Sequence, residues 1–400
     1  MNLINRLLLA PINDLNGEEF RESFQNLTSK DRHLFVEKTI YNQFSPVLLY
    51  YINNNNLEDL FIDKYLTDLR NQSKRFQIQS LETIKEIIFL DKIFKKNNIN
   101  AVFLKGAAMM NEYSDVSLRP LVDIDILVEK KEVFYVYNIL KSNSYNESSS
   151  VELKERDFNK YIESHHHLPE LSRSSNIMVE IHHRLTSVND FKNCPLSERV
   201  INNKILHNFY GANIYLPSIN DLISHSLIHF SLSNGFNKSL RIFNDIYQLE
   251  KKYDIDWIQI YSLNNGKFRK AVSLSLEILN YHFEFTNNFS DLKMKFKDYF
   301  PEKKIIESAY KETFDLKNAT IPKKTFLKLG NSKGFFNFLR KVFNRIFINN
   351  YDINYYSFTK FKSLNYFLSY CYNTFFRFIT YFPMIFNLFF KRGVGINTCE

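Results

Sequence analysis

The stretch VDIDILV at residues 122–128 decides how this chain folds. Apolar and charged residues alternate through Asp125 and then give way to an apolar run, which is typical of a half-buried β-strand. Residues two apart on a strand point to the same face, so Asp123 and Asp125 project side by side. Two carboxylates this close repel each other unless one is protonated or a cation lies between them. The pattern favours a site for a divalent ion such as Mg²⁺, although Asp-x-Asp pairs are also common on solvated strand faces.

An anion-binding turn is expected just before this strand. Residues 101–104 form a predicted buried strand that ends at Lys105-Gly106, and a helix is predicted to start directly afterwards. A strand, a glycine turn and a helix N-terminus bring backbone N–H groups and a nearby ammonium to face a phosphate. A third predicted strand, at residues 177–181, carries Glu180. Together these segments supply three carboxylates and a phosphate-binding turn.

The motifs, in chain order, are LKG at 104–106, Arg119 followed by DIDILV at 123–128, and VEIHHRL at 179–185. In this combination the chain resembles the nucleotidyltransferase superfamily of DNA polymerase beta type. More narrowly, it resembles the bacterial uncharacterised nucleotidyltransferase family. The resemblance implies that Asp123 and Asp125 are the paired aspartates and that Glu180 is the third carboxylate. Lys105-Gly106 stands where the wider superfamily usually has Gly-Ser, a departure that the narrower family shares.

The resemblance covers only part of the chain. It is most specific over residues 103–184 and continues more weakly at His225-x₃-His229, Arg241-x₃-Asp245 and Asp256-Trp257, and residues 331–400 show none. It implies an α+β fold, in which a small mixed nucleotidyltransferase sheet is flanked by mainly helical N-terminal and C-terminal regions.

Periodicity and the resemblance divide the chain into four predicted parts. These are a helical N-terminal region at 1–97, a nucleotidyltransferase catalytic domain at 98–194, a helical domain closing the nucleotide cleft at 195–330, and a basic aromatic amphipathic tail at 331–400. Within the first part, helices are predicted at 58–69 and 77–94, where apolar residues recur every three or four positions. The role expected for that part is to pack against the catalytic sheet.

The composition is that of a globular chain. Of the 400 residues, 44% are hydrophobic and 16% aromatic, and the length allows two or three domains. The cysteines, at 194, 371 and 399, are odd in number and widely spaced, so they predict neither a disulfide framework nor a zinc motif. The first residues lack a basic region followed by a long apolar run, so no signal peptide is expected. We therefore expect a cytoplasmic protein.

Histidines gather near the predicted carboxylates. Five of them lie at residues 165–167 and 182–183, but their spacing does not match a zinc site, which usually has fixed ligand intervals. His182 lies two residues after Glu180 on the same strand face, so it is predicted to hydrogen-bond a phosphate or to orient a metal ligand. One histidine of residues 165–167 is expected to approach it from a neighbouring strand.

Two further pairs are spaced four residues apart in predicted helices. His225 and His229 share one helix face, and the resemblance favours core packing or a nucleotide contact over metal binding, because the sequence lacks the Glu of the metalloprotease motif. Arg241 and Asp245 are predicted to form an ion pair on the next helix.

The last seventy residues differ from the rest. Residues 331–400 contain nine Lys or Arg and two Asp or Glu, and so hold seven of the net nine positive charges. A basic amphipathic helix is predicted at 335–346, and the aromatic run at 364–390 is long enough for a bilayer but has a polar stripe and Pro383. Packing on the body, peripheral membrane contact through 335–390, and a span remain alternatives, of which the stripe disfavours the span. A basic tail also permits nucleic acid binding.

The resemblance implies an enzyme that moves an NMP from an NTP, such as ATP, to a hydroxyl acceptor. The acceptor would be a small molecule, a glycan precursor, a peptide or a protein. Asp123, Asp125 and Glu180 would bind Mg²⁺ or Mn²⁺, and Glu180 is alternatively the base that takes the acceptor proton. Lys105 and the Gly106 turn would hold the triphosphate.

Two other residues are predicted to contact the nucleotide, Arg119 through a bidentate contact and His182 through a hydrogen bond. Two alternative functions remain. One is a non-catalytic nucleotide-binding or regulatory protein of the same fold, against which the presence of all three carboxylates weighs. The other is an RNA-modifying nucleotidyltransferase.

Overall fold

The structure is a computed structural model that describes residues 3–147, 153, 155–173, 177–186, 194–232, 236, 239–264, 266–282, 292 and 294. All of these belong to the first of the two units into which the chain divides, Met1–Ser148 with Leu153–Leu316. The predictions for the tail, at 335–346 and 364–390, lie outside the described residues. No helix within the described ranges combines the length and the apolar content that crossing a membrane requires.

The described residues build a mixed seven-stranded sheet in the order β3-β4-β5-β2-β1-β7-β6. The strands are β1 (Val102–Phe103), β2 (Asp123–Leu127), β3 (Asn146–Glu147), β4 (Leu171–Ser172), β5 (Met178–His182), β6 (Ile205–Phe209) and β7 (Ala212–Leu216). The central strand β2 runs parallel to β5 and antiparallel to β1. The predicted α+β class, a mixed sheet between helical regions, is confirmed.

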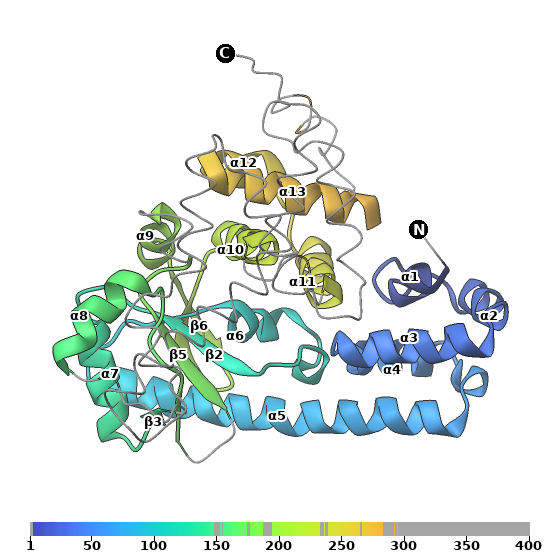
Figure 1. The fold of residues 1–400 in the computed structure, drawn as a ribbon, viewed down its shortest axis with the longest axis horizontal. Helices are drawn as coiled ribbons and strands as arrows, with labels where there is room; N and C mark the ends of the chain where they lie inside the picture. Colours follow the sequence, from blue (N-terminus) through green and yellow to red (C-terminus); the bar gives the residue numbers. More distant parts are fainter. Residues whose placement is uncertain are drawn as a thin grey trace, which may run out of the picture. The chain divides into compact units, whose positions relative to one another are not determined.

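Helices cover the sheet from both termini. Before β1 come α1 (Leu3–Leu8), α2 (Gly17–Gln25), α3 (Ser29–Tyr41), α4 (Ser45–Asn54) and α5 (Asp63–Lys96). Within and after the sheet come α6 (Lys105–Met109), α7 (Val133–Ser142), α8 (Glu155–Ser164), α9 (Pro195–Asn202), α10 (Ile219–Leu232), α11 (Ser239–Lys252), α12 (Trp257–Leu263) and α13 (Gly266–His282). Figure 1 shows α5 and α7 on one side of the sheet and α6, α10 and α11 on the other.

The two central strands bury one apolar face. Ile124 and Ile126 on β2, and Val179 and Ile181 on β5, are fully buried. They alternate with the acidic residues, and the side chains of a strand alternate between its two faces. The apolar face therefore packs on the side of α5 and α7, and the polar positions face α6 and α10.

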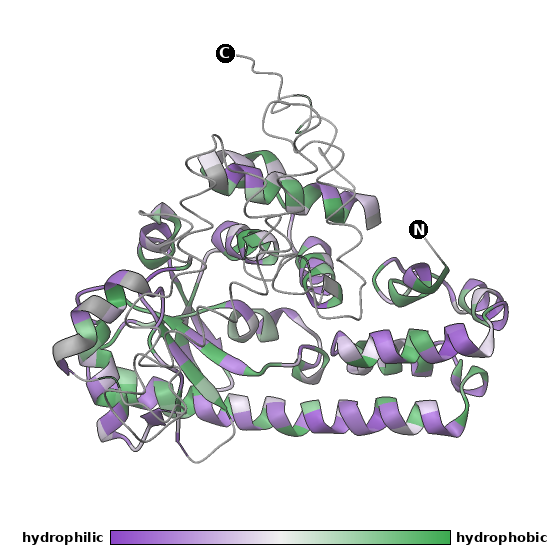
Figure 2. Ribbon diagram, in the orientation of Figure 1, coloured by the Kyte–Doolittle hydropathy of each residue, from purple (hydrophilic) through white to green (hydrophobic). Residues whose placement is uncertain are grey.

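The helix α5 is longer than the sequence predicts. The predicted helices at 58–69 and 77–94 are one 34-residue helix, Asp63–Lys96, preceded by a single 3₁₀ turn at Glu58–Leu60. No proline or glycine interrupts residues 70–76, so nothing in the sequence breaks the helix there. Hydrophobic and hydrophilic residues alternate along α5 in Figure 2, as expected of a helix with one buried stripe.

The hairpin of β6 and β7 was not predicted. It turns at Tyr210-Gly211, both with positive φ (49° and 85°), which is the backbone that a tight two-residue hairpin needs. Strand β7 then pairs in parallel with β1. The sheet therefore continues beyond residue 194, where the predicted catalytic domain ends, while the four domain boundaries themselves stay predictions.

Candidate functional site

The candidate site is built by the register of two neighbouring parallel strands. Asp125 of β2 lies directly opposite Glu180 of β5, and Leu127 lies opposite His182. Asp123 is one pleat before Asp125, and His182 is one pleat after Glu180, so all four polar side chains share the face toward α6 and α10. The sheet therefore brings the paired aspartates next to Glu180, as predicted.

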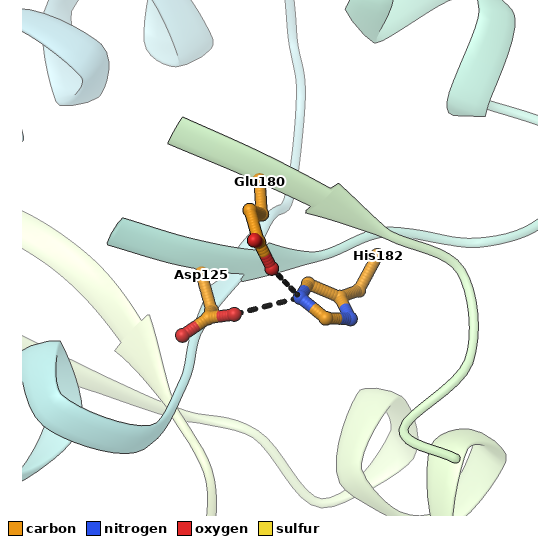
Figure 3. A group of neighbouring side chains, drawn as sticks. All are labelled: Asp125, Glu180 and His182. Carbon is orange, nitrogen blue, oxygen red and sulfur yellow. Dashed lines mark hydrogen bonds and ion pairs between the residues drawn. The ribbon is translucent and has the colours of Figure 1, made fainter. Parts of the chain in front are cut away.

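Asp125 is the most enclosed of the three carboxylates, with 2% of its surface exposed. Its Oδ1 accepts hydrogen bonds from Lys105 Nζ at 2.5 Å and from His182 Nε2 at 2.7 Å. His182 Nε2 also lies 3.1 Å from Glu180 Oε2, so the imidazole bridges the two strands (Figure 3). His182 thus orients two acidic side chains, which is one of the two roles predicted for it.

The charges of the cluster are unequally compensated. Burial raises the pKa of Asp125, but the Lys105 charge and the His182 hydrogen bond outweigh it and hold that pKa well below its usual range. Burial raises the pKa of Glu180, but the His182 hydrogen bond and the charges of His167 and His182 together outweigh it, so that this pKa is also lowered. Burial and the neighbouring Asp125 instead raise the pKa of Asp123 to about 6. The outer carboxylate is therefore the one that still lacks a cation.

The donor set fits a divalent metal ion. One atom each from Asp125, Glu180 and His182 lie within 4.8 Å of one another, and Asp123 projects from the same strand face. Carboxylate oxygens are preferred by Mg²⁺ and Mn²⁺, and an imidazole nitrogen is acceptable to Mn²⁺ and other transition metals. Among the described residues, no second group of three such ligands comes together. The structure thus groups two of the three predicted ligands, Asp125 and Glu180, with His182, while the role of Asp123 as a ligand stays a prediction.

Lys105 and Gly106 stand at the start of α6, as predicted. Lys105 has a positive φ of 44°, and its ammonium group lies against Asp125. Gly106 is buried, and a Cβ there would lie 1.8 Å from Leu121 Cδ2. Any larger residue at this position would therefore force the buried Leu121 side chain to move, whatever the role of Gly106 toward a phosphate.

Arg119 lies in a buried ion pair. Its Nε and Nη2 donate to the two carboxylate oxygens of Asp245 at 2.6 and 2.9 Å, and Nη1 donates to the carbonyl oxygen of Pro120 at 2.9 Å. Tyr113 donates a further hydrogen bond to Asp245 Oδ1 at 2.7 Å. The predicted bidentate contact of Arg119 is therefore made with a carboxylate of α11, and this placement offers no support for a nucleotide contact.

The predicted ion pair between Arg241 and Asp245 is wrong. Both carboxylate oxygens of Asp245 are taken by Arg119, a residue 126 positions away in the chain. Helical spacing makes two residues neighbours, but a bidentate guanidinium from another element competes better for one carboxylate. Near the site, the role predicted for Arg241 is therefore the one that fails. The sequence did contain a warning, because Arg119 and Arg241 are two arginines that can compete for the single carboxylate of Asp245.

Several histidines near the site are partly or fully buried, and burial lowers the pKa of two of them. His167 forms an isolated antiparallel bridge with His182, which confirms that a histidine of 165–167 approaches from the neighbouring segment. Burial lowers the pKa of His166 to about 2 and that of His225 to about 3. Both ring nitrogens of His225 are buried without a hydrogen-bond partner among the described residues. Its burial agrees with core packing, one of the two readings that the sequence left open.

Fold and site together define an α+β protein with a candidate metal centre on the face of a mixed sheet that α6 and α10 cover. The profile of the uncharacterised nucleotidyltransferase family matches residues 28–284, and the chain belongs to this family. A nucleotidyltransferase-like antigenic protein from Paracoccidioides brasiliensis is similar in structure, with 13% sequence identity and a TM-score of 0.27 over 57% of this chain and 92% of that chain. No curated protein matches the sequence.

Proposed function

We propose that this protein is a metal-dependent nucleotidyltransferase that moves an NMP from an NTP to a hydroxyl acceptor. The carrying observation is that Asp123, Asp125 and Glu180 share one face of two adjacent strands. Membership of a nucleotidyltransferase family supports the reaction class. The motif resemblance to the DNA polymerase beta-type superfamily supports the use of two aspartates and a third carboxylate as the metal-binding set.

Asp123, Asp125 and Glu180 would hold Mg²⁺ or Mn²⁺, with His182 beside them. Such an ion, when bound, supplies positive charge to the phosphate oxygens and makes a hydroxyl easier to deprotonate. The chain prepares for this by keeping Asp125 and Glu180 ionised through Lys105 and His182. It leaves Asp123 short of a positive charge.

Nucleotidyl transfer requires a base for the proton of the acceptor hydroxyl, and it releases pyrophosphate as the leaving group. The acceptor oxygen attacks the α-phosphorus, a new P–O bond forms, and the bond to pyrophosphate breaks. Glu180 is placed to take the proton of the acceptor hydroxyl, since its ionised carboxylate is 13% exposed and is oriented by His182. Glu180 is thus proposed as a metal ligand and as the candidate general base.

Lys105 is the proposed contact for the nucleotide phosphates. Its side chain is 24% exposed, so the ammonium can exchange its contact with Asp125 for one with a phosphate oxygen. ATP is the NTP that we expect, and serine, threonine or sugar hydroxyls are the expected acceptors. An RNA end is the alternative acceptor within the same chemistry.

Labelled nucleotide transfer tests the proposal directly. Purified protein is incubated with each α-³²P-labelled NTP, with Mg²⁺ or Mn²⁺, and with a host extract separated into small-molecule, protein and RNA fractions. We expect one fraction to acquire label only when a divalent ion is present, with pyrophosphate released in equal amount. Binding of an NTP without transfer to any fraction would instead identify a nucleotide-binding protein.

The place of action is proposed from the sequence alone. We propose a cytoplasmic enzyme with peripheral contact to the inner membrane surface through residues 335–390, which would suit a lipid-linked acceptor. Co-sedimentation of the full-length protein with anionic and with neutral vesicles measures this contact. Equal sedimentation with both would contradict it.

A further inference from the structure

Arg241 is a charged group without a partner among the described residues. It lies in the first turn of α11, is partly buried, and forms no hydrogen bond or ion pair with the described residues. Burial, and then the nearby charge of Arg119, lower its pKa to about 10. A partly buried guanidinium without an anionic partner lowers the stability of the fold. We therefore look for a role of Arg241 other than stabilising the fold.

The neighbouring ion pair explains why Arg241 stays unpaired. Asp245, one turn later on the same helix, is neutralised by Arg119 and holds a further hydrogen bond from Tyr113. Arg119 Nη1 in turn lies 3.6 Å from where a Cβ of Gly106 would be. The Arg119–Asp245 pair therefore fixes the first turns of α11 beside the start of α6, and it does so without using Arg241.

The other acid that acts on Arg241 belongs to the candidate metal site. Arg241 lies within electrostatic reach of Asp123, but the two side chains form no ion pair. His225 and His229, which face the same cluster from α10, are kept neutral by burial. Lys105 of α6 already contacts Asp125, so the uncompensated positive charge that α6, α10 and α11 offer near Asp123 comes from Arg241.

A ligand that suits this arrangement has negative charge next to a metal-binding group. Asp123 offers a carboxylate to a cation, and Arg241 offers a fork of N–H donors to anionic oxygens. A polyphosphate chelated to a divalent ion satisfies both at once. Arg119 cannot fill this role in the same way, because each of its nitrogens already donates to a protein group.

We propose that Arg241 binds the triphosphate of the NTP, and that Arg119 serves to hold α11 in the position that presents Arg241. This inference rests on the proposed function, since it names a residue for the substrate of that same site. It makes Arg241 a substrate-binding residue and Arg119 a positioning residue.

The test compares binding of inorganic tripolyphosphate, of the four NTPs and of the four nucleosides to the full-length protein with Mg²⁺, by calorimetry. The variants are Arg241→Gln, Arg241→Lys and the charge-matched control Arg70→Gln, which removes an exposed arginine of α5. We expect Arg241→Gln to weaken tripolyphosphate and NTP binding roughly 10- to 100-fold, while Arg241→Lys is intermediate and Arg70→Gln behaves as the wild type. Mn²⁺ binding by paramagnetic resonance should be equal in all of them.

The results separate this inference from the proposed function. Because an unpaired charge is removed, the melting temperature of Arg241→Gln should equal or exceed that of the wild type. Undiminished tripolyphosphate binding by Arg241→Gln, or a lowered melting temperature with lost Mn²⁺ binding, would overturn the role of Arg241 and leave the proposed function standing. A wild-type protein that binds Mg²⁺ but neither tripolyphosphate nor any NTP would overturn both.

Discussion

Two buried groups of charges lie close together in this protein and are organised in opposite ways. In the Arg119–Asp245 pair, one guanidinium meets one carboxylate with two hydrogen bonds, and Tyr113 adds a third. In the site on β2 and β5, three carboxylates face Lys105 and His182, and Asp123 is left with a pKa raised to about 6. The first group is complete without a ligand, whereas the second is incomplete.

The contrast gives a way to separate structural from functional charges. In a matched buried pair, the attraction between the partners offsets the cost of removing both charges from water. Removing one partner therefore lowers the free energy of unfolding. Carboxylates that repel one another lower stability and are retained where chemistry needs them. Four substitutions follow. One removes a carboxylate of the site, one removes the cation of the matched pair, and two change residues that belong to neither group.

The largest effect is expected for Asp123→Asn on turnover. The change keeps the size of the side chain and removes the charge that would attract the metal ion, so NMP transfer should fall by at least about a thousandfold. The melting temperature should be unchanged or slightly higher, since a carboxylate that repels Asp125 is gone. Transfer of labelled NMP and thermal unfolding measure the two quantities. An active Asp123→Asn variant would remove the residue from the site.

The next effect is expected for Arg119→Met on stability. It leaves the buried Asp245 carboxylate without its guanidinium, which should cost about 3–5 kcal/mol of unfolding free energy in urea. The double variant Arg119→Met with Asp245→Leu removes both charges and should regain most of that loss. If both variants are as stable as the wild type, the pair is not what holds α11 to the sheet.

A smaller effect is expected for Gly106→Ala. The added Cβ would collide with Leu121 Cδ2, which should cost about 1–3 kcal/mol through overpacking. Leu121→Ala is itself destabilising because Leu121 is buried, but the double variant should be more stable than the sum of the single changes predicts. Strict additivity in urea unfolding would show that the cost of a side chain at residue 106 does not come from Leu121 packing.

The smallest effect concerns Glu250, a carboxylate on α11. It accepts a hydrogen bond from the indole N–H of Trp257 and forms no ion pair with any residue that the structure describes. Burial raises its pKa from 4.5 to about 7. Between these two values the folded state binds more protons than the unfolded state, so this group makes stability fall as pH rises from 4.5 to 7. Glu250→Gln should flatten that part of the stability curve and be the more stable form at pH 8. Parallel curves for the two proteins would contradict the raised pKa.

Much of the site was predictable because strands impose a simple rule on side chains. The alternation in residues 122–128 gave β2 to within one residue at each end, and the same rule put His182 on the face of Glu180. The approach of a histidine of 165–167 to β5 was also expected, and the His167–His182 bridge shows it. These successes depend on local periodicity, which one segment is enough to reveal.

The failures concern groups that are far apart in sequence. The hairpin β6–β7 was overlooked because its turn is Tyr-Gly, and its outer strand is mostly exposed. The partner of Asp245 was mistaken because spacing along a helix shows which residues are neighbours, but not which distant guanidinium reaches the carboxylate first. The packing role of Gly106 depends on Leu121, which the turn motif did not include.

The sequence by itself determined that Asp123, Asp125, Glu180 and His182 lie on strand faces where their side chains can meet, because a period of two needs no knowledge of the rest of the chain. Only the tertiary structure decided that β2 and β5 are adjacent and parallel, with Asp125 opposite Glu180. It also decided that Arg119 pairs with Asp245 and that Arg241 has no ion pair among the described residues. The physical reason is that ion pairs depend on which groups the packed elements bring within a few ångströms, and a buried charge is satisfied by the best-placed partner, however distant in sequence.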